Sequence, residues 1–318
     1  MFRWILLTLS LLATVPAHAA PTAESVRAQI KGRDAQALMA ARTLTRAMPT
    51  QYEAWIELAR AELHFGEAKR AVDAAEQAVS VAPDRFEPYL TLSEVLSQRI
   101  NEVGMFAKMG VAGDLREALE TARRLAPQEV APRRALMQYY MQAPGIAGGS
   151  MDKARAESDA IAALDIAEGH AVLAMLAQHD GQRDLALSEF RRALSLKPES
   201  PRYRLQVGLT LQAMERWEEA FAHFETWVAA EPESGAALYQ LGRTAALSGQ
   251  RLDLGVEAFQ RFLALAPDID DPEPTYAWFR LGEVQRHAGR SELARHAFER
   301  AVQLDANNDE ARKALVAL

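Results

Sequence analysis

The segment Tyr52–Arg85, YEAWIELARAELHFGEAKRAVDAAEQAVSVAPDR, contains two apolar patterns separated by a glycine. In the first half, large apolar residues recur at the three- and four-residue spacing of one helix face. In the second half, alanines recur at the same spacing until a proline ends the pattern. The segment therefore predicts a helical hairpin of 34 residues, in which large side chains fill a groove and small ones let two helices touch. The positions that carry the pattern are Trp55, Leu58, Ala59, Gly66, Ala71, Ala75, Ala78 and Pro83.

At these positions the segment resembles the tetratricopeptide repeat, whose spacing is W-x2-L-[GA]…G…A…A…P. Ala75 departs from the family pattern, which usually has a large aromatic residue there. Similar units recur along nearly all of the remaining chain, and no alternation typical of strands competes with them. The resemblance implies an all-α fold, namely a right-handed superhelical solenoid of antiparallel helix pairs with a concave inner groove and a C-terminal capping helix.

The repeat pattern divides the chain after its first 19 residues into about eight units and a cap. The expected boundaries are 20–51, which is a partial unit, 52–85, 86–129, 130–166, 167–200, 201–234, 235–269 and 275–308, with the cap at 309–318. The last two units are joined through Asp268–Pro274, DIDDPEP, whose prolines and acids disfavour a helix. We interpret this stretch as a spacer.

Two adjacent units exceed the repeat length between their helices, at 101–113 (NEVGMFAKMGVAG) and 142–152 (QAPGIAGGSMD). Both insertions leave the same end of their hairpins, so we expect long loops that pack on each other. The first contains Met105, Phe106 and Met109, which could form an adaptable surface for partners. Alternatively, the three side chains fold back beside the next unit on the convex side, and this second interpretation is our prediction.

The second insertion has a candidate loop site at Gly145, Gly148, Gly149 and Ser150. Glycines free the backbone, and successive N–H groups beside a helix start can bind an anion. The alternative is a tight connection between two helices in which Ser150 caps the second helix. A plain repeat needs no such loop, which favours a special role.

The first residues, MFRWILLTLSLLATVPAHAA, have the organisation of a secretory signal peptide. A positive charge at Arg3 precedes the apolar run Ile5–Val15, and Ala17-His18-Ala19 is a small-x-small site. We expect a signal peptide at 1–19, cleaved after Ala19, with an uncleaved anchor as the alternative. The expected location of the mature protein is a bacterial periplasm, and secretion is the second choice.

Composition and motifs exclude several classes of function. The net charge is −7, which gives no basic surplus for nucleic acid, and the absence of cysteine excludes disulfides and Cys-ligated zinc. No H-E-x-x-H, G-x-S-x-G, G-x-G-x-x-G or P-loop motif occurs. The seven histidines are scattered, and His170 sits at a repeat packing position, where we expect a core histidine. We therefore expect no catalytic residues, no metal and no cofactor.

In the family that the chain resembles, the first helix of each unit lines the concave face. Transferring those positions gives a set rich in Arg, Gln, His and Tyr, although the whole chain is acidic. Arg and Tyr are frequent interface anchors, and Arg holds carboxylates well. The set predicts a groove for an extended acidic or C-terminal segment of another protein; the alternative is a merely polar inner face. The candidate groove residues are Arg60, His64, Gln98, Arg134, Gln138, Gln178, Arg202, Gln212, Tyr239, Arg243, Tyr276 and Arg286.

These features together predict a periplasmic scaffold or adaptor that binds peptide or protein segments, with envelope proteins as partners and no enzymatic activity. The alternative is a ligand-binding accessory subunit of an envelope transport or assembly system that uses the glycine-rich insertion at 142–152. A closed pocket beside Gly148 would favour the accessory subunit, and a long open groove would favour the scaffold.

Overall fold

The computed structural model describes residues 21–318, so the expected signal peptide at 1–19 lies outside the described residues. Within 21–318 the chain forms seventeen α-helices, one short 3-10 helix and no strand. No helix in this part of the chain combines the length and the apolar character that a membrane crossing requires. The predicted all-α solenoid of antiparallel helix pairs with a C-terminal capping helix is confirmed.

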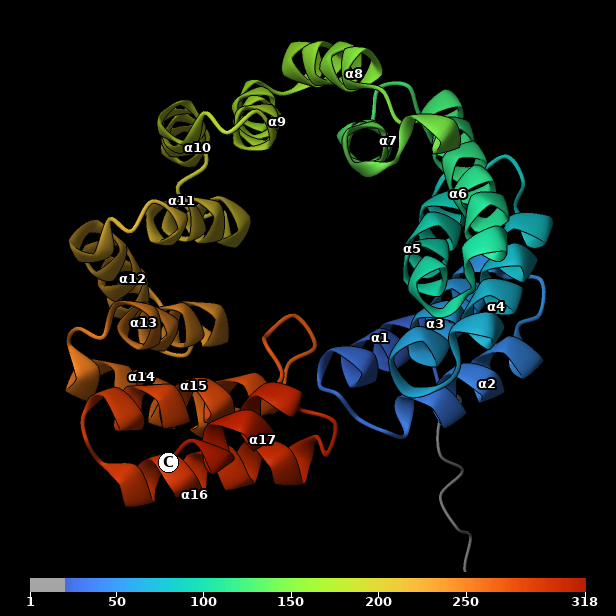
Figure 1. Ribbon diagram of the computed structural model, residues 1–318. Coiled ribbons are helices and arrows are strands. Elements are labelled where there is room, and N and C mark those ends of the chain that lie inside the picture. Colours follow the sequence, from blue (N-terminus) through green and yellow to red (C-terminus); the bar gives the residue numbers. More distant parts are fainter. Residues whose placement is uncertain (1–20) are drawn as a thin grey trace, which may run out of the picture.

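The helices follow one another as hairpins along a curved row that comes round to its own start (Figure 1). The first helix of a pair, such as α7 or α11, lies on the inner side of the curve, and the second, such as α8 or α12, lies outside. The helices are α1 (Ala23–Lys31), α2 (Ala37–Ala47), α3 (Tyr52–Phe65), α4 (Ala68–Val81), α5 (Glu87–Glu102), α6 (Met105–Leu125), α7 (Val130–Gln142), η1 (Gly145–Ala147), α8 (Met151–Leu164), α9 (Ile166–His179), α10 (Arg183–Leu196), α11 (Pro201–Ala213), α12 (Trp217–Ala230), α13 (Gly235–Ser248), α14 (Leu252–Ala264), α15 (Pro274–His287), α16 (Ser291–Leu304) and α17 (Asp309–Val316).

Small residues on the first helix of a pair receive aromatic rings from the second. A Cβ added at Gly208 would lie 2.1 Å from Phe224, and one added at Gly242 would lie 2.7 Å from Phe259. Both phenylalanines are completely buried. The glycine of the repeat pattern therefore lets a ring pack directly on the neighbouring helix backbone.

The first insertion does not form the long loop that we predicted. Its residues extend α5 to Glu102 and start α6 at Met105, which leaves a connection of two residues. Met105 is 81% exposed and Phe106 is 97% exposed, so the prediction that they fold back on the convex side is wrong. The physical reason is that the sequence between residues 101 and 113 contains no proline, so both helices continue past the packed part of the repeat.

The second insertion is a compact connection between α7 and α8. Gly148 adopts a left-handed φ of 92°, and the Ser150 side chain accepts a hydrogen bond from the Lys153 amide, so the predicted cap is present. The insertion lies beside α6, to which Tyr139 of α7 connects it: the Tyr139 hydroxyl lies 2.9 Å from the Ala112 carbonyl and 2.6 Å from the Ala147 carbonyl. Phe106 takes no part in this contact because it is exposed.

The two ends of the solenoid have different roles in the fold. The capping helix α17 buries Ala311 completely and covers the apolar side of the last hairpin, near Phe298. The stretch that we interpreted as a spacer, between α14 and α15, is not helical, but it also reaches the turn between α1 and α2 (Figure 1). The amide of Ile269 donates a hydrogen bond of 2.7 Å to the Lys31 carbonyl. The solenoid is therefore closed into a ring.

Candidate functional site

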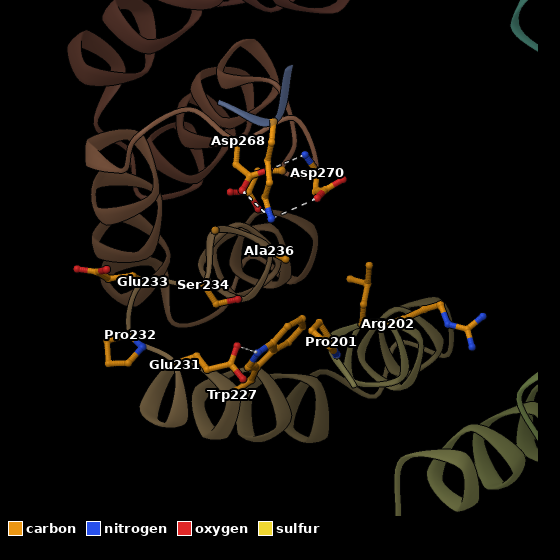
Figure 2. A pocket seen from close by; sticks show the side chains of 14 residues that line it. Pro201, Arg202, Trp227, Glu231, Pro232, Glu233, Ser234, Ala236, Asp268 and Asp270 are labelled. Atoms are coloured by element: carbon orange, nitrogen blue, oxygen red, sulfur yellow. Dashed lines mark hydrogen bonds and ion pairs between the residues drawn. The ribbon is translucent and has the colours of Figure 1, made fainter. Parts of the chain in front are cut away.

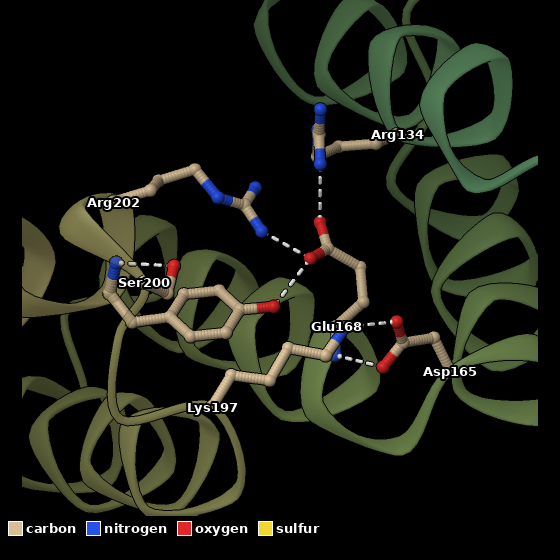
Figure 3. A network of polar contacts seen from close by, with 7 residues as sticks. Arg134, Asp165, Glu168, Lys197, Ser200 and Arg202 are labelled. Atoms are coloured by element: carbon tan, nitrogen blue, oxygen red, sulfur yellow. Dashed lines mark hydrogen bonds and ion pairs between the residues drawn. The ribbon is translucent and has the colours of Figure 1, made fainter.

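Two predicted groove residues, Arg134 on α7 and Arg202 on α11, form a ladder of charges with Glu168 on α9, which was not among the predicted groove residues. Arg134, Glu168 and Arg202 are each separated by 34 residues, so they recur once per repeat. Arg134 donates to Glu168 at 2.6 Å, Arg202 donates to the other carboxylate oxygen, and the Tyr203 hydroxyl donates to it at 2.6 Å (Figure 3). One glutamate therefore joins three consecutive repeats.

The environment of Glu168 keeps its carboxylate ionised. The side chain is 5% exposed, and burial alone would raise its pKa. Hydrogen bonds from Arg202, Tyr203 and Arg134 outweigh burial and lower the pKa of Glu168 below its usual value. Burial and the bond to Glu168 raise the pKa of Tyr203 to about 12, so its hydroxyl keeps its proton. Arg134 and Arg202 are thus paired with an ionised carboxylate of the same protein.

A second buried glutamate holds another predicted groove arginine. Glu57 on α3 is fully buried and lies 2.6 Å from Arg27 and 3.2 Å from Arg60. Arg60 and Arg134 therefore share a feature that the repeat pattern does not reveal: each already forms an ion pair with a buried carboxylate of a neighbouring turn or repeat. One feature of the sequence could have indicated this pairing: an acidic residue on an inner helix, at a position that the repeat pattern expects to be buried.

Arg243 on α13 differs from these arginines. Within residues 21–318, no acidic side chain lies within ion-pair distance of Arg243, and its Nη1 donates to Gln212 Oε1. Gln212 is held by its own Nε2, which donates to the Thr244 hydroxyl at 2.9 Å and to the Gln240 carbonyl at 3.2 Å. Burial, followed by the nearby charge of Arg280, lowers the pKa of Arg243. This guanidinium has donors left over and no internal counter-charge.

The remaining predicted groove residues fall into two groups. Gln212 and Tyr239 are buried, and Tyr239 packs edge-to-face on Phe259 and Phe262, which makes it part of the core. The side chains of the other group reach the surface: His64, Gln98, Gln138, Gln178, Tyr276 and Arg286 are exposed or half-buried. The structure thus brings Gln212 and Arg243 into contact and joins Arg134 to Arg202 through Glu168.

A cleft with a volume of about 720 Å³ lies between α5, α6 and α7. The predicted residues Arg134 and Gln138 line it, together with Leu115 and Tyr139. Ser97 and Asn101 also line it, although the sequence analysis did not select them. Asn101 comes from the added turn of α5, and no repeat-based argument could have placed it. The cleft combines apolar walls with a few polar groups, as small-molecule sites do.

The insertion 142–152 forms one wall of this cleft through Ala143, Pro144 and Ala147, whereas the four residues of the candidate loop site do not line it. Its backbone amides are occupied: Gly148 donates to Gly145, Gly149 donates to Pro144, and Ser150 donates to Tyr140. The glycines meet steric demands instead, since a Cβ on Gly149 would lie 1.7 Å from the Ala143 carbonyl oxygen. The observed hydrogen bonds match a tight connection rather than an anion-binding loop.

Histidine and metal chemistry add no site within residues 21–318. No group of three or more His, Asp and Glu side chains there could hold a metal ion. The expectation that His170 is a core histidine is wrong, because its side chain is part-exposed and its Nδ1 lies 2.6 Å from Glu189. The reason is that the buried Glu189 of α10 offers a polar partner within the same hairpin.

Comparison with known proteins identifies the class to which this fold and inner face belong. A tetratricopeptide repeat profile matches residues 23–88, 205–269 and 244–311, which together cover more than half of the chain. The chain belongs to the tetratricopeptide repeat family. Proteins of this family bind other proteins or peptides and are generally non-catalytic scaffolds.

Individual relatives are distant. The chain is 34% identical over 120 residues to the protein O-mannosyl-transferase Tmtc1 of Drosophila melanogaster, covering 36% of this chain and only 14% of that protein. Among solved structures, yeast Tom70 is similar with a TM-score of 0.69 at 14% identity, covering 96% of this chain and 65% of that chain. A human IFIT1 dimer has a TM-score of 0.58 at 18% identity, covering 93% and 71%. At these identities the structural likeness shows the fold alone.

Proposed function

We propose that this chain is a periplasmic scaffold whose concave face binds an extended acidic segment, or the C-terminus, of an envelope protein. The observation that carries the proposal is Arg243, an arginine on an inner helix that has no acidic partner within residues 21–318. The leader-like residues 1–19 support the periplasmic location. The proposal includes no catalytic step, cofactor or nucleic acid.

The surroundings of Arg243 suit a carboxylate from outside the chain. Of its five N–H donors, one is given to Gln212 Oε1, and Gln212 cannot turn away because its amide is bonded on its other side. Burial and the nearby Arg280, which itself pairs with Glu283 at 2.6 Å, lower the pKa of Arg243, so a bound anion stabilises a charge that its surroundings disfavour. A bidentate carboxylate satisfies the remaining donors of the planar guanidinium.

The test uses a fluorescent peptide of alternating Asp and Gly with a free C-terminus, titrated into the full-length mature protein. Arg243→Gln should weaken binding about tenfold or more, because a charge-assisted hydrogen bond is worth about 1.5–3 kcal/mol. The control is Arg295→Gln, which removes the same charge from an exposed position on the outer helix α16. Equal affinity of the Arg243→Gln variant and the wild type would reject the site.

The location has its own test. The mature protein is isolated from a periplasmic extract of a Gram-negative host and its N-terminus is sequenced. We expect it to begin at Ala20, which follows the predicted cleavage site. A protein that keeps Met1 and stays in the cytoplasmic fraction would contradict the proposed export without affecting the peptide test.

The cleft between α5, α6 and α7 favours a second function, that of a ligand-binding accessory subunit. Its volume of about 720 Å³ suits a small molecule, and its wall includes the glycine-rich insertion. The variant Ser97→Trp fills the cleft. It should abolish co-purification of a small molecule, as detected by native mass spectrometry, and leave peptide binding at Arg243 unchanged. The same masses in the wild type and the variant would reject this function.

A further inference from the structure

The ring closes where the turn between α1 and α2 meets the loop 268–273 between α14 and α15. Arg33 adopts a left-handed φ of 53° and is only 16% exposed. Its Nε donates to the Asp268 carbonyl at 2.8 Å, its Nη2 donates to the Asp271 carbonyl at 2.7 Å, and its Nη1 pairs with Glu273. A single arginine from the start of the chain therefore holds three groups of the loop.

Lys31 extends the same contact. Its ammonium lies 3.7 Å from Asp268 and 3.8 Å from Asp270, and its carbonyl accepts the hydrogen bond from the Ile269 amide. Figure 2 shows Asp268 and Asp270 together at one end of a cleft whose opposite walls include Pro201, Arg202 and Trp227. The contact thus borders the inner space of the ring.

The loop itself is anchored to the C-terminal half of the molecule. The Asp271 side chain sits against the start of α13, where a Cβ on Gly235 would come within 2.0 Å of its carboxylate oxygen. Burial, followed by the negative charges of Asp268 and Asp270, raises the pKa of Asp271. Three acids therefore stand close together in this loop, and a cation beside them is favoured. The loop is a preformed acceptor for Lys31 and Arg33.

No apolar core crosses this boundary in the described part of the chain. The cluster that contains α1 and α2 is built from residues between Ala23 and Phe65. The clusters at the other end begin at Leu205 and contain no residue of α1 or α2. All other neighbouring hairpins share apolar side chains, whereas the ring closure consists of hydrogen bonds and ion pairs. Opening the ring closure therefore leaves each of these apolar clusters intact.

We propose that Lys31 and Arg33, seated on the acidic loop 268–273, form an electrostatic latch that opens and closes the solenoid ring. In the closed ring a partner segment reaches the inner face only through the two openings along the ring axis. In the open form the inner face is also accessible from the side. The state of the latch therefore determines whether a long partner segment can reach the inner face from the side. With the latch closed, an end of the segment has to pass through the ring.

The test measures the distance across the latch. The chain has no cysteine, so two introduced cysteines carry spin labels without background. Glu24→Cys on α1 and Glu299→Cys on α16 report the latch, because both positions are exposed on opposite sides of it. Asp159→Cys and Glu218→Cys, exposed on α8 and α12, report the middle of the solenoid. Distances are measured by pulsed electron paramagnetic resonance on the full mature chain.

If the latch is closed in the wild type at low salt, the spin labels at positions 24 and 299 should give a narrow distance distribution. Arg33→Glu should replace it with a broad distribution at longer distances, while the 159–218 pair stays unchanged. Arg46→Glu, an equal charge change at an exposed position on α2 away from the loop, is the matched control. Raising salt from 0.1 to 1 M shortens the Debye length from about 10 to about 3 Å and should broaden the wild-type distribution.

Three results would overturn the latch. One is a 24–299 distribution that Arg33→Glu leaves narrow and in place. Another is a wild-type distribution at low salt that is already as broad as that of the variant. The third is an equal broadening by Arg46→Glu. The unchanged 159–218 pair shows that each variant is folded, and because no peptide is present, the result is independent of Arg243.

Discussion

The stretch of inner helices α7, α9 and α11 and the stretch α11, α13 and α15 are built on the same repeat but treat their arginines differently. In the first, Glu168 lies between Arg134 and Arg202 and forms an ion pair with each of them. In the second, Arg243 meets Gln212 in place of a carboxylate. The repeat pattern predicts all these arginines as equivalent groove residues, but the structure separates them.

This difference teaches how one surface can combine stability and binding. An arginine that is paired with a buried acid connects neighbouring repeats, and a partner would have to compete with that acid. An arginine without an acid adds little to stability and keeps its donors for a partner. The binding function is therefore expected where the internal pairing is missing.

The largest expected effect is on stability and concerns the contacts of Glu168 with Arg134 and Arg202. Glu168→Ala should lower the free energy of unfolding by about 2–3 kcal/mol, which is less than the ~3–5 kcal/mol of a fully buried pair because both arginines remain part-exposed. Urea denaturation followed by circular dichroism measures it. Glu218→Ala, at an exposed position on α12, is the control and should change stability by no more than about 0.5 kcal/mol. Equal stability of the two variants would show that the ion pairs of Glu168 do not stabilise the first stretch more than an exposed acid does.

A smaller effect compares one substitution in both stretches. Arg202→Gln should cost about 1 kcal/mol, because Glu168 loses a charged hydrogen-bond donor. Arg243→Gln should stay within about 0.5 kcal/mol of the wild type. Its lowered pKa means that the fold disfavours its charge, so a neutral residue costs little. Denaturation midpoints of both variants check the difference, and a larger loss at Arg243 would reverse our assignment of stabilising residue and binding site.

The smallest effect concerns pH and sharpens the role of Glu168. Its folded pKa is lowered from 4.5, so its stabilising contribution is fully present above pH 4.5 and is lost as pH falls through the folded pKa. The stability difference between the wild type and Glu168→Gln should therefore shrink on acidification below pH 4.5. Arg243→Gln, which removes no carboxylate, should keep a constant difference from the wild type over the same range. A constant difference for Glu168→Gln would show that its charge does not matter.

Three features of the structure were not predicted from the sequence. The 101–113 insertion has no proline to end a helix, so it lengthens α5 and α6, whereas counting residues against the repeat length predicted a loop. The spacer 268–274 was recognised as non-helical, but its contact with Arg33 joins residues 235 positions apart, which no local pattern contains. The sequence also did not show which arginines are paired with an acid and which are not, because this depends on side chains from different repeats.

The amino-acid sequence by itself determined the hairpins and their stacking into a solenoid. Helix periodicity, the glycine and proline breaks and the small residues opposite large ones act within one repeat or between neighbours, so they can be recognised locally. Only the tertiary structure decided that the solenoid closes into a ring and that Arg243 lacks the acid that Arg134 and Arg202 share. Both depend on the accumulated curvature of many repeats and on the exact reach of long side chains, and these quantities exist only once the whole chain is folded.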